Sequence, residues 1–221
     1  MQGRNAAERI FVRPLKDLRS RIAGRVVVLP PVIEAAVTRL APVGAPWALA
    51  GGWALDLACD VETRDHSDVD IAIFREDQRR FRSAFENWTC EQVIGGIMQP
   101  WTADGWIAPP IHELHIRTPT DGTSILELLM NERDSSSWVY RRDPRIRRAL
   151  LDAVQTHRGI PVLAPEIVLL YKSKAARQLD QADFQRVLPV LSPSAAVWLH
   201  DALALASPGH PWAAALSGRE A

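Results

Sequence analysis

Two aspartates, Asp68 and Asp70, stand at alternate positions at the start of an apolar segment that runs from Val69 to Phe74. Alternate side chains of a strand point to the same face, so these two carboxylates are expected to lie side by side. Like charges at such a distance repel each other unless a cation lies between them. Oxygen ligands suit magnesium or manganese better than zinc. The pair therefore predicts a divalent-metal site, with a solvated strand edge that carries two acids as the open alternative.

A pair of glycines, Gly51-Gly52, follows the short apolar run 47–50 and precedes a segment with helical character. Glycines after a strand allow backbone N–H groups to come close to a ligand, and the positive N-terminal end of the following helix favours phosphate. An ordinary tight turn is the alternative interpretation. The aspartate pair downstream favours the phosphate-binding interpretation.

A third acid, Glu127, is embedded in the apolar run SILELLM at 124–130. If this run is a strand, Leu126, Leu128 and Met130 share one face and Glu127 points to the other. An acid inside such a run usually has a partner, which predicts that Glu127 completes the metal site with the aspartates. The alternative is an edge-strand charge that prevents aggregation.

These residues need a sheet and flanking helices to bring them together, and the hydrophobic periodicity predicts both. Helices are predicted at 5–29, 32–40, 53–59, 76–88, 166–179, 181–191 and 194–205. Strands are predicted at 47–50, 69–74, 93–98, 106–107, 111–117, 124–130, 149–155 and 160–163. The second half of the chain contains hairpins around TPTDGT and THRG, and it ends in a Pro/Gly-rich tail. We therefore expect an α+β fold with a small mixed sheet flanked by helices at 1–163 and a C-terminal helical region at 164–221.

The composition restricts the classes of function. Lys and Arg together number 26, as do Asp and Glu, so the formal net charge is zero, and no global field attracts nucleic acid. The basic run RRDPRIRR at 141–148 is interpreted as a solvated loop and helix start. Cys59 and Cys90 lack metal-ligand spacing, the N-terminus does not resemble a signal peptide, and no stretch approaches the roughly 20 apolar residues of a membrane span. A cytoplasmic protein without a membrane or nucleic-acid partner is expected, and nothing in the sequence indicates its oligomeric state.

The glycine turn, the aspartate pair and the later acid resemble the nucleotidyltransferase superfamily that includes DNA polymerase beta. More narrowly, GGWALDL at 51–57 followed by TRDHSDVDIAIF at 63–74 is similar to the lincosamide and aminoglycoside nucleotidyltransferases and their bacterial relatives. The stretches WVYRRDP, LAPEIVLLYKSKAAR and PGHPW also resemble those relatives, and the likeness covers roughly residues 45–215. It implies the nucleotidyltransferase fold.

The resemblance also implies roles for individual residues. By this likeness Asp68, Asp70 and Glu127 are the catalytic and metal-binding carboxylates, which share two Mg²⁺ ions. Gly51 and Gly52 match the phosphate-binding turn. Three further residues match positions near the nucleotide, the metal pair or the triphosphate: Arg64, His66 and Lys172. Relatives often carry Gly-Arg where this chain has Asp60-Val61, so a phosphate contact from that Arg is not expected here.

The activity implied is transfer of a nucleoside monophosphate from an NTP to a hydroxyl of a small molecule, with release of pyrophosphate. ATP is the usual donor in the family, and an aminoglycoside or a lincosamide is the candidate acceptor. Two alternatives stay open at this point: a DxD glycosyltransferase that binds a nucleotide-sugar through a metal, and a nucleotide-binding or antitoxin-like module without transferase activity. The glycosyltransferase would need a Rossmann-like half before the DxD, but only about 45 residues precede the strand and glycine turn of this chain, and they look helical.

Overall fold

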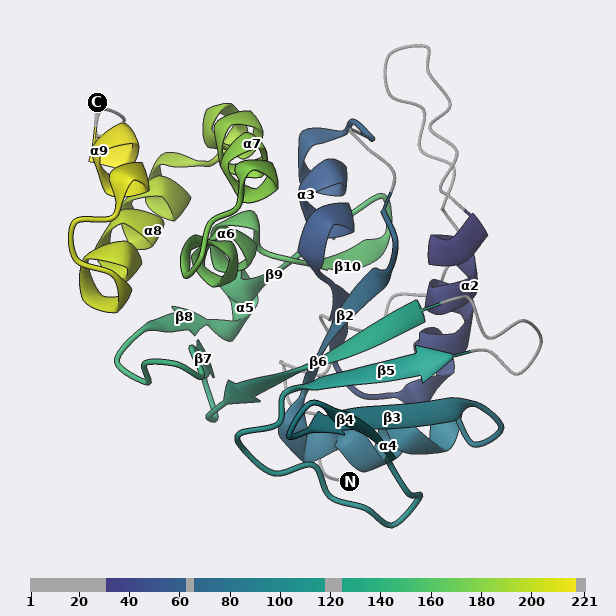
Figure 1. Cartoon of the computed structure of the whole chain (residues 1–221). Helices are drawn as coiled ribbons and strands as arrows, with labels where there is room; N and C mark the ends of the chain where they lie inside the picture. The colour runs from purple at the N-terminus through teal and green to yellow at the C-terminus, as the bar shows by residue number, and fades with distance from the viewer. Residues whose placement is uncertain (1–30, 63–65, 118–124, 218–221) are drawn as a thin grey trace, which may run out of the picture.

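A mixed β-sheet forms the centre of the computed structural model, which describes residues 31–62, 66–117 and 125–217 (Figure 1). The helices are α2 (Pro31–Leu40), α3 (Gly51–Cys59), α4 (Gln78–Ala84), α5 (Leu150–Ala153), α6 (Pro165–Ser173), α7 (Gln178–Val187), α8 (Pro193–Ala206) and α9 (Pro211–Ser217). The strands are β1 (Trp47–Leu49), β2 (Val69–Phe74), β3 (Thr89–Ile94), β4 (Ile97–Pro100), β5 (Glu113–Arg117), β6 (Ile125–Arg133), β7 (Ser137–Val139), β8 (Arg147–Ala149), β9 (Val154–His157) and β10 (Ile160–Leu163).

The strand order is β4-β3-β5-β6-β2-β1-β10-β9, and β7 pairs with the end of β6 and with β8. The pairs β2–β6 and β1–β10 are parallel, and the other neighbours are antiparallel. Strand β2, which follows the predicted metal-binding aspartate Asp68, is therefore a central strand between β1 and β6. Central strands are held by hydrogen bonds on both sides, which gives their side chains fixed positions.

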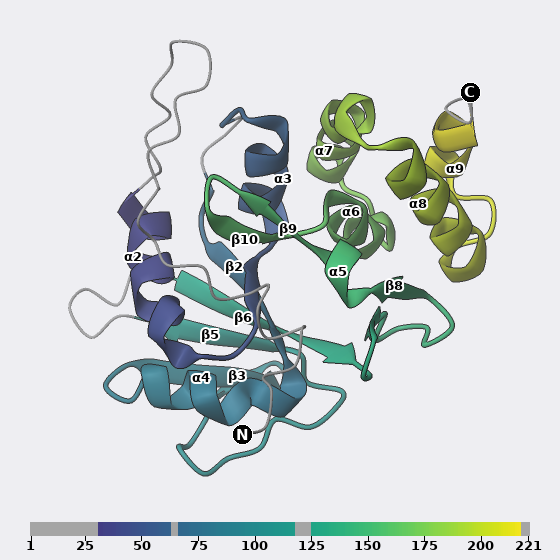
Figure 2. The same cartoon turned by 180° about the vertical axis from the view of Figure 1, so that it is seen from behind.

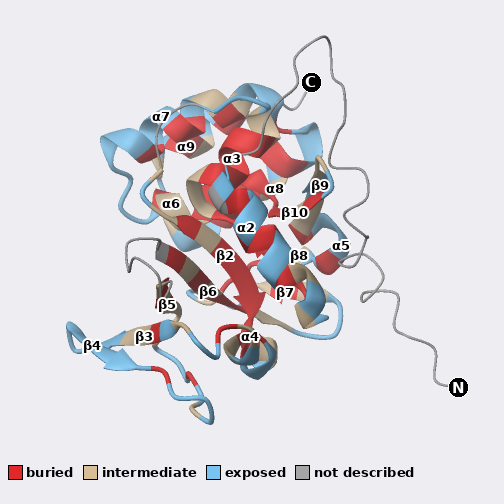
Figure 3. Ribbon diagram, turned by 90° about the vertical axis from the view of Figure 1, so that its right-hand side faces the viewer, coloured by how far each residue is buried: buried red, intermediate tan, exposed pale blue. Residues whose placement is uncertain are grey.

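The alternation of side chains along the central strands separates an apolar face from a polar one. The apolar face is buried and includes Ile71 of β2, Leu128 of β6 and Leu114 of β5. These residues belong to one hydrophobic core with Phe81 of α4 and Ile33 of α2. Helices α2 and α4 lie over the sheet in Figure 2, and the buried residues in Figure 3 concentrate on the central strands. The acids of the sequence motifs are left on the other face.

Helices α6 to α9 form a second layer beside β9 and β10, on the side of the sheet where β6 leads into β7 (Figures 1 and 2). Pro165 starts α6 at a position where its missing N–H costs nothing. Ser192 caps α8 by accepting a hydrogen bond from the Ala195 N–H at 3.2 Å. Phe184 of α7 stacks on Trp212 of α9, with ring centroids 4.4 Å apart. The helical layer is thus packed internally and forms a stable wall next to the sheet.

The predicted α+β class with a mixed sheet and flanking helices is confirmed. The strand at 69–74 has the predicted bounds, and the segments predicted at 111–117 and 124–130 form the expected antiparallel pair. The predicted division into 1–163 and 164–221 stays a prediction. Among the described residues, no helix combines the length and the apolar character that crossing a bilayer would require.

Several predicted elements differ from those observed. The single strand predicted at 93–98 is wrong, because Gly95 and Gly96 have positive φ angles of 58° and 81° and turn the chain between β3 and β4. Residues 106–107 form no strand, and the predicted helix at 76–88 is shortened to α4 after a 3-10 turn at Arg75–Asp77. The Pro/Gly-rich tail contains α9. The helix predicted at 5–29 lies outside the described residues.

Candidate active site

Asp70 of β2 and Glu127 of β6 lie directly opposite each other in the parallel register of the two strands. The Glu127 carboxyl donates a hydrogen bond to the Asp70 carboxylate. Burial raises the pKa of Asp70 to about 6, and the negative charges of Asp68 and Glu113 add to this effect. The pKa of Glu127 is raised to about 8, mainly by burial and next by the negative charge of Asp70. The two acids therefore share a proton in the metal-free protein, because both cannot be ionised side by side without a cation.

Gly51 brings the β1–α3 turn into contact with Asp70. Its φ is +58°, and a Cβ atom at this position would lie 1.7 Å from the Asp70 Oδ2 atom. The backbone N–H of Ala50 also donates to the Asp70 carbonyl oxygen at 2.8 Å. Only a residue without a side chain allows this close approach. Gly52 follows Gly51 in the first turn of α3.

Asp68 lies immediately before β2 and accepts a hydrogen bond from the Ser67 hydroxyl at 3.0 Å. Its charge raises the pKa of both Asp70 and Glu127, so it acts on the same site. The three carboxylates provide only oxygen donors, which is the ligand chemistry that Mg²⁺ prefers. The shared proton between Asp70 and Glu127 and the space left open by Gly51 are both consistent with a site built for a divalent cation. These residues thus fit the metal that the sequence implies.

Strand β5 continues the polar row on this face of the sheet. His115 is paired in register with Glu127, and their Nδ1 and Oε1 atoms are 3.5 Å apart. The His115 Nε2 atom is 3.5 Å from Oε1 of Glu113. Ligand atoms of Glu113, His115 and Glu127 all lie within 4.8 Å of one another, a grouping that overlaps the predicted metal triad only at Glu127. Asp70 is hydrogen-bonded to Glu127 and lies at the more buried end of the row, so the aspartates are the stronger candidates for metal ligands.

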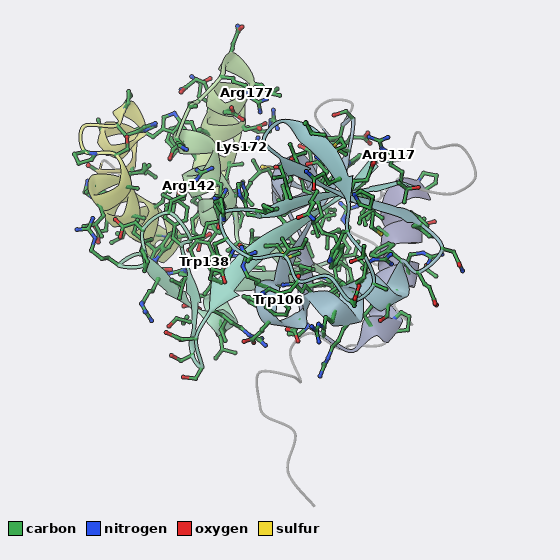
Figure 4. The ribbon with its side chains drawn as sticks, turned by 60° about the horizontal axis from the view of Figure 1, so that its bottom comes forward. Trp106, Arg117, Trp138, Arg142, Lys172 and Arg177 are labelled. Atoms are coloured by element: carbon green, nitrogen blue, oxygen red, sulfur yellow. The ribbon has the colours of Figure 1, made fainter. Side chains whose placement is uncertain are left out.

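A cavity of about 370 Å³ separates this acidic face from the helical layer. Carboxylates of Asp70, Glu113 and Glu127 line it on the sheet side. The cationic side chains that line it come from the β7–β8 loop and from the α6–α7 segment: Arg141, Arg142, Lys172, Lys174 and Arg177. Figure 4 shows Arg177, Lys172 and Arg142 following one another along the helical side, whereas Arg117, at the end of β5, lies far from them. The cavity therefore offers oxygen ligands for a cation on one wall and positive charge for an anion on the other.

Lys172 lines the cavity, but its ammonium group is already paired. Its Nζ atom is 2.9 Å from Asp180 Oδ1 and 2.9 Å from Asp183 Oδ2, and both aspartates are buried. Its charge still lowers the pKa of Asp70. Lys172 thus joins α6 to α7 and contributes positive potential to the site, whereas the sequence resemblance implied a lysine directed at the triphosphate.

His66 is directed away from the aspartate pair. Its Nε2 atom lies 2.7 Å from Asp56 Oδ2, and its ring lies 4.3 Å from the Trp53 ring. Asp56 also accepts a hydrogen bond from Arg186 of α7 at 3.3 Å. His66 therefore attaches the loop before β2 to α3, which differs from the role beside the metal that the resemblance implied. Arg64 lies outside the described residues.

The arginines at 141–142 were missed by the sequence interpretation, which treated the whole run 141–148 as solvated. Arg145 fits that interpretation, with a side chain that is 69% exposed and paired with Asp143. Arg141 and Arg142 instead line the cavity. The signal in the sequence was the preceding Trp138 and Tyr140, which are both buried and fix the start of the loop against the core.

Comparison with known proteins is consistent with this geometry. A sequence model of the aminoglycoside-2''-adenylyltransferase family matches residues 32–187. The chain belongs to this family. It is therefore a nucleotidyltransferase, and the membership indicates activity of the kind that modifies antibiotics. The glycosyltransferase alternative is no longer needed.

Solved structures of two antibiotic-modifying proteins share the fold of this chain. The lincosamide antibiotic adenylyltransferase LnuA, bound to lincomycin, has a TM-score of 0.53 at 15% identity and covers 74% of this chain and 99% of its own. The solution structure of ANT(2'')-Ia has a TM-score of 0.52 at 14% identity, with coverage of 85% and 94% respectively. ANT(2'')-Ia in complex with adenylyl-2''-tobramycin has a TM-score of 0.50 at 13% identity, with coverage of 86% and 97%. No curated protein matches the chain.

Proposed function

We propose that the protein transfers AMP from ATP, in the presence of magnesium, to a hydroxyl group of an aminoglycoside or a lincosamide, and releases pyrophosphate. The observation that carries this proposal is the in-register pair Asp70 and Glu127, which faces a wall of cationic side chains across a cavity of about 370 Å³. A nucleoside triphosphate with its metal carries both kinds of charge: the carboxylate wall would bind the cation, and the cationic wall would bind the phosphates. LnuA and ANT(2'')-Ia, which share the fold, are named for adenylyl transfer to such antibiotics.

In this proposal Asp68, Asp70 and Glu127 would hold the magnesium ions, whose chemistry is to neutralise charge on the phosphates and to acidify the acceptor hydroxyl. Asp70 is positioned for this role by its strand and by the close approach of Gly51. The positive N-terminal end of α3, which begins at Gly51, favours phosphate beside the carboxylates.

The acceptor oxygen forms a bond to the α-phosphorus, and the bond from that phosphorus to the oxygen that bridges to the β-phosphorus breaks. The bonding electron pair leaves with pyrophosphate, and the hydroxyl proton passes to the Glu127 carboxylate and then to solvent. Glu127 can accept this proton only as a carboxylate, which is the form that a bound cation would favour.

The acceptor is proposed to approach over β5, beside Glu127. This side of the cavity carries Glu113 as well as Glu127, whereas Glu91, farther along the row, is already paired with Arg117. A surplus of carboxylates at this end favours an acceptor that carries ammonium groups, which is the chemistry of an aminosugar. This feature favours an aminoglycoside over a neutral acceptor.

The proposal is tested by incubating the protein with labelled ATP, Mg²⁺ and pooled aminoglycosides and lincosamides, and by measuring pyrophosphate. Release that depends on the acceptor, and a nucleotidylated product of the expected mass, are the expected results. The Asp70→Asn variant is the inactive control. ATP binding without turnover on any acceptor would contradict the proposal and favour the nucleotide-binding module. Replacing ATP by GTP, CTP or UTP in the same assay measures the preference for the base.

A further inference from the structure

We propose that Arg141 and Arg142 together bind the β- and γ-phosphates of the donor nucleotide, and that this arginine pair determines the preference of the site for a triphosphate over a monophosphate. This inference rests on the proposed nucleotidyl transfer and assigns the leaving group to one part of the cavity. It follows from three features of the β7–β8 loop: the position of the pair, the neutral character of its partners, and the rigidity of its support.

The pair is well placed to meet the leaving group. Both arginines line the cavity that also contains Asp70 and Glu127, and they lie on the wall opposite the carboxylates. A nucleotide whose α-phosphate lies at the carboxylates would extend its β- and γ-phosphates away from them. The helical side of the cavity is the direction in which positive charge is available, as the labelled Arg142 and Lys172 show in Figure 4.

The polar partners that the structure gives these two guanidinium groups are neutral. Arg141 is hydrogen-bonded to the side chain of Tyr171, and its Cζ atom lies 5.4 Å from the centre of the Tyr171 ring. Arg142 donates to the Tyr140 hydroxyl and to the Tyr171 carbonyl oxygen, each at 3.2 Å. Within 31–62, 66–117 and 125–217, neither arginine forms an ion pair with a carboxylate. Two neighbouring guanidinium groups repel each other unless an anion lies between them, so this pair is expected to bind an anion.

The other cations of the cavity are less suited to this role. Lys172 is held between Asp180 and Asp183. The Arg177 side chain is 72% exposed and paired with Asp180 at 2.9 Å. Lys174 follows α6 and is exposed, as Arg142 is, but no hydrogen bond within the described residues orients its ammonium group, whereas Arg142 is held by Tyr140 and Tyr171. Arg141 is partly buried, and burial lowers its pKa, with the charge of Arg142 acting in the same direction. A bound polyphosphate would offset both effects, and a guanidinium can contact two phosphate oxygens at once.

The support under the pair is rigid. The loop is closed by backbone hydrogen bonds from Tyr140 N–H to the Ile146 carbonyl oxygen at 3.0 Å and from Ile146 N–H to the Asp143 carbonyl oxygen at 3.0 Å. Below it, the Trp138 indole N–H donates to Asn131 Oδ1 at 2.9 Å, and the Tyr171 hydroxyl donates to the same oxygen at 3.4 Å. Preorganised donors lose little entropy on binding and can stabilise charge that develops on the leaving pyrophosphate.

The test measures the affinity of the full-length protein, with Mg²⁺, for a non-hydrolysable α,β-methylene ATP analogue, for AMP and for inorganic pyrophosphate. The variants are Arg141→Gln and Arg142→Gln, and the control is Arg145→Gln, which changes an arginine of the same loop outside the cavity. We expect each variant to weaken binding of the ATP analogue and of pyrophosphate about 10-fold or more, the usual loss for one charge-assisted contact. The affinity for AMP should stay at the wild-type value, and Arg145→Gln should leave all three affinities unchanged.

The outcomes separate this inference from the proposed function. If the wild-type protein binds the ATP analogue and both variants bind it equally well, the arginine pair has no phosphate role and the inference fails, while the proposed function stands. Equal weakening for the ATP analogue and for AMP also overturns it, because the pair would then act on the nucleoside or on the loop as a whole. If the wild-type protein binds no nucleotide, the proposed function itself fails. Thermal unfolding and an Arg141→Lys variant, which keeps the charge and should restore part of the affinity, exclude misfolding as the cause.

Discussion

Asp70 on β2 and Glu127 on β6 are register partners in a parallel strand pair, and they share a hydrogen bond through a proton held by Glu127. This relationship links two segments that are far apart in the sequence. Without a metal ion, one of the two acids must keep its proton at neutral pH, because two adjacent carboxylates would repel each other.

Asp70→Asn is expected to lower the rate of nucleotidyl transfer by about 100-fold or more, because it removes a charged oxygen ligand at the reacting phosphate. The fold should persist, since the substitution also removes one of two repelling carboxylates. Steady-state turnover and a circular dichroism spectrum measure these effects. Asp201→Asn, which changes an exposed acid on α8, is the matched control and should keep full activity. Near-wild-type turnover of Asp70→Asn would remove the carboxylate pair from the mechanism.

The stability of the metal-free protein should fall as the pH rises from 4.5 to about 8. Unfolded Glu127 loses its proton near pH 4.5, whereas burial and the charge of Asp70 raise the pKa of the folded residue to about 8. The folded protein therefore binds more protons in this interval, and its free energy of unfolding decreases with pH. We expect a change of more than about 1 kcal/mol, since one pKa unit corresponds to about 1.4 kcal/mol.

Urea denaturation in the presence of EDTA measures this dependence. The Glu127→Gln variant should lose the part of this dependence above about pH 6, where Asp70 no longer contributes, whereas Glu86→Gln, at an exposed position on the other side of the sheet, should keep it. A wild-type protein whose stability is constant between these pH values would show that Glu127 titrates normally.

Magnesium binding should strengthen with pH over the range in which Asp70 and Glu127 lose their protons. The pKa of Asp70 is raised to about 6 and that of Glu127 to about 8, mainly by burial and next by the charges of neighbouring carboxylates. A cation must displace these protons, so its apparent affinity rises between about pH 6 and pH 8 and protons are released. Isothermal titration in two buffers with different ionisation enthalpies gives the number of protons released. No release at pH 6.5 would contradict the shared proton.

Gly51→Ala is expected to destabilise the protein and to weaken metal binding, because its Cβ atom would occupy the position of the Asp70 carboxylate. Gly44→Ala is the matched control. Gly44 has a similar φ of +68°, but nothing lies within 4 Å of its added Cβ atom. Both variants share the cost of a positive φ, about 1 kcal/mol. The additional loss of stability and of Mg²⁺ affinity in Gly51→Ala alone measures the contact with Asp70, and equal effects in the two variants would show that this contact is unimportant.

Lys172→Met is expected to lower the free energy of unfolding by about 3 kcal/mol, because it leaves buried carboxylates of Asp180 and Asp183 without their shared cation. Lys174→Met, at an exposed position two residues farther along, should change stability by less than about 0.5 kcal/mol. Chemical denaturation at pH 7 measures both. If Lys172→Met is neutral for stability but weakens ATP binding, Lys172 serves the phosphates as the sequence resemblance implied.

Local patterns in the sequence were sufficient for the parts of the site that depend on one segment. The alternation at 68–74 predicted Asp68 and Asp70 on one face of a strand, because the side-chain period of a strand is fixed by its backbone. In the structure Asp70 lies within β2 and Asp68 immediately precedes it. The acid within 124–130 and the glycine turn at 51–52 were identified by the same local geometry. The resemblance to nucleotidyltransferases rested on these segments, and the family comparison confirmed it.

Only the tertiary structure decided which of these segments meet and what else faces them. The register of Asp70 against Glu127 depends on long-range pairing of β2 with β6, which no local periodicity specifies. The run at 141–148 has one composition but two environments, since Arg145 is solvated while Arg141 and Arg142 line the cavity. Lys172 pairs with Asp180 and Asp183 of α7, and His66 pairs with Asp56 of α3. The strand period is a property of the backbone, whereas the partner of a charged side chain is determined by the packing of distant elements.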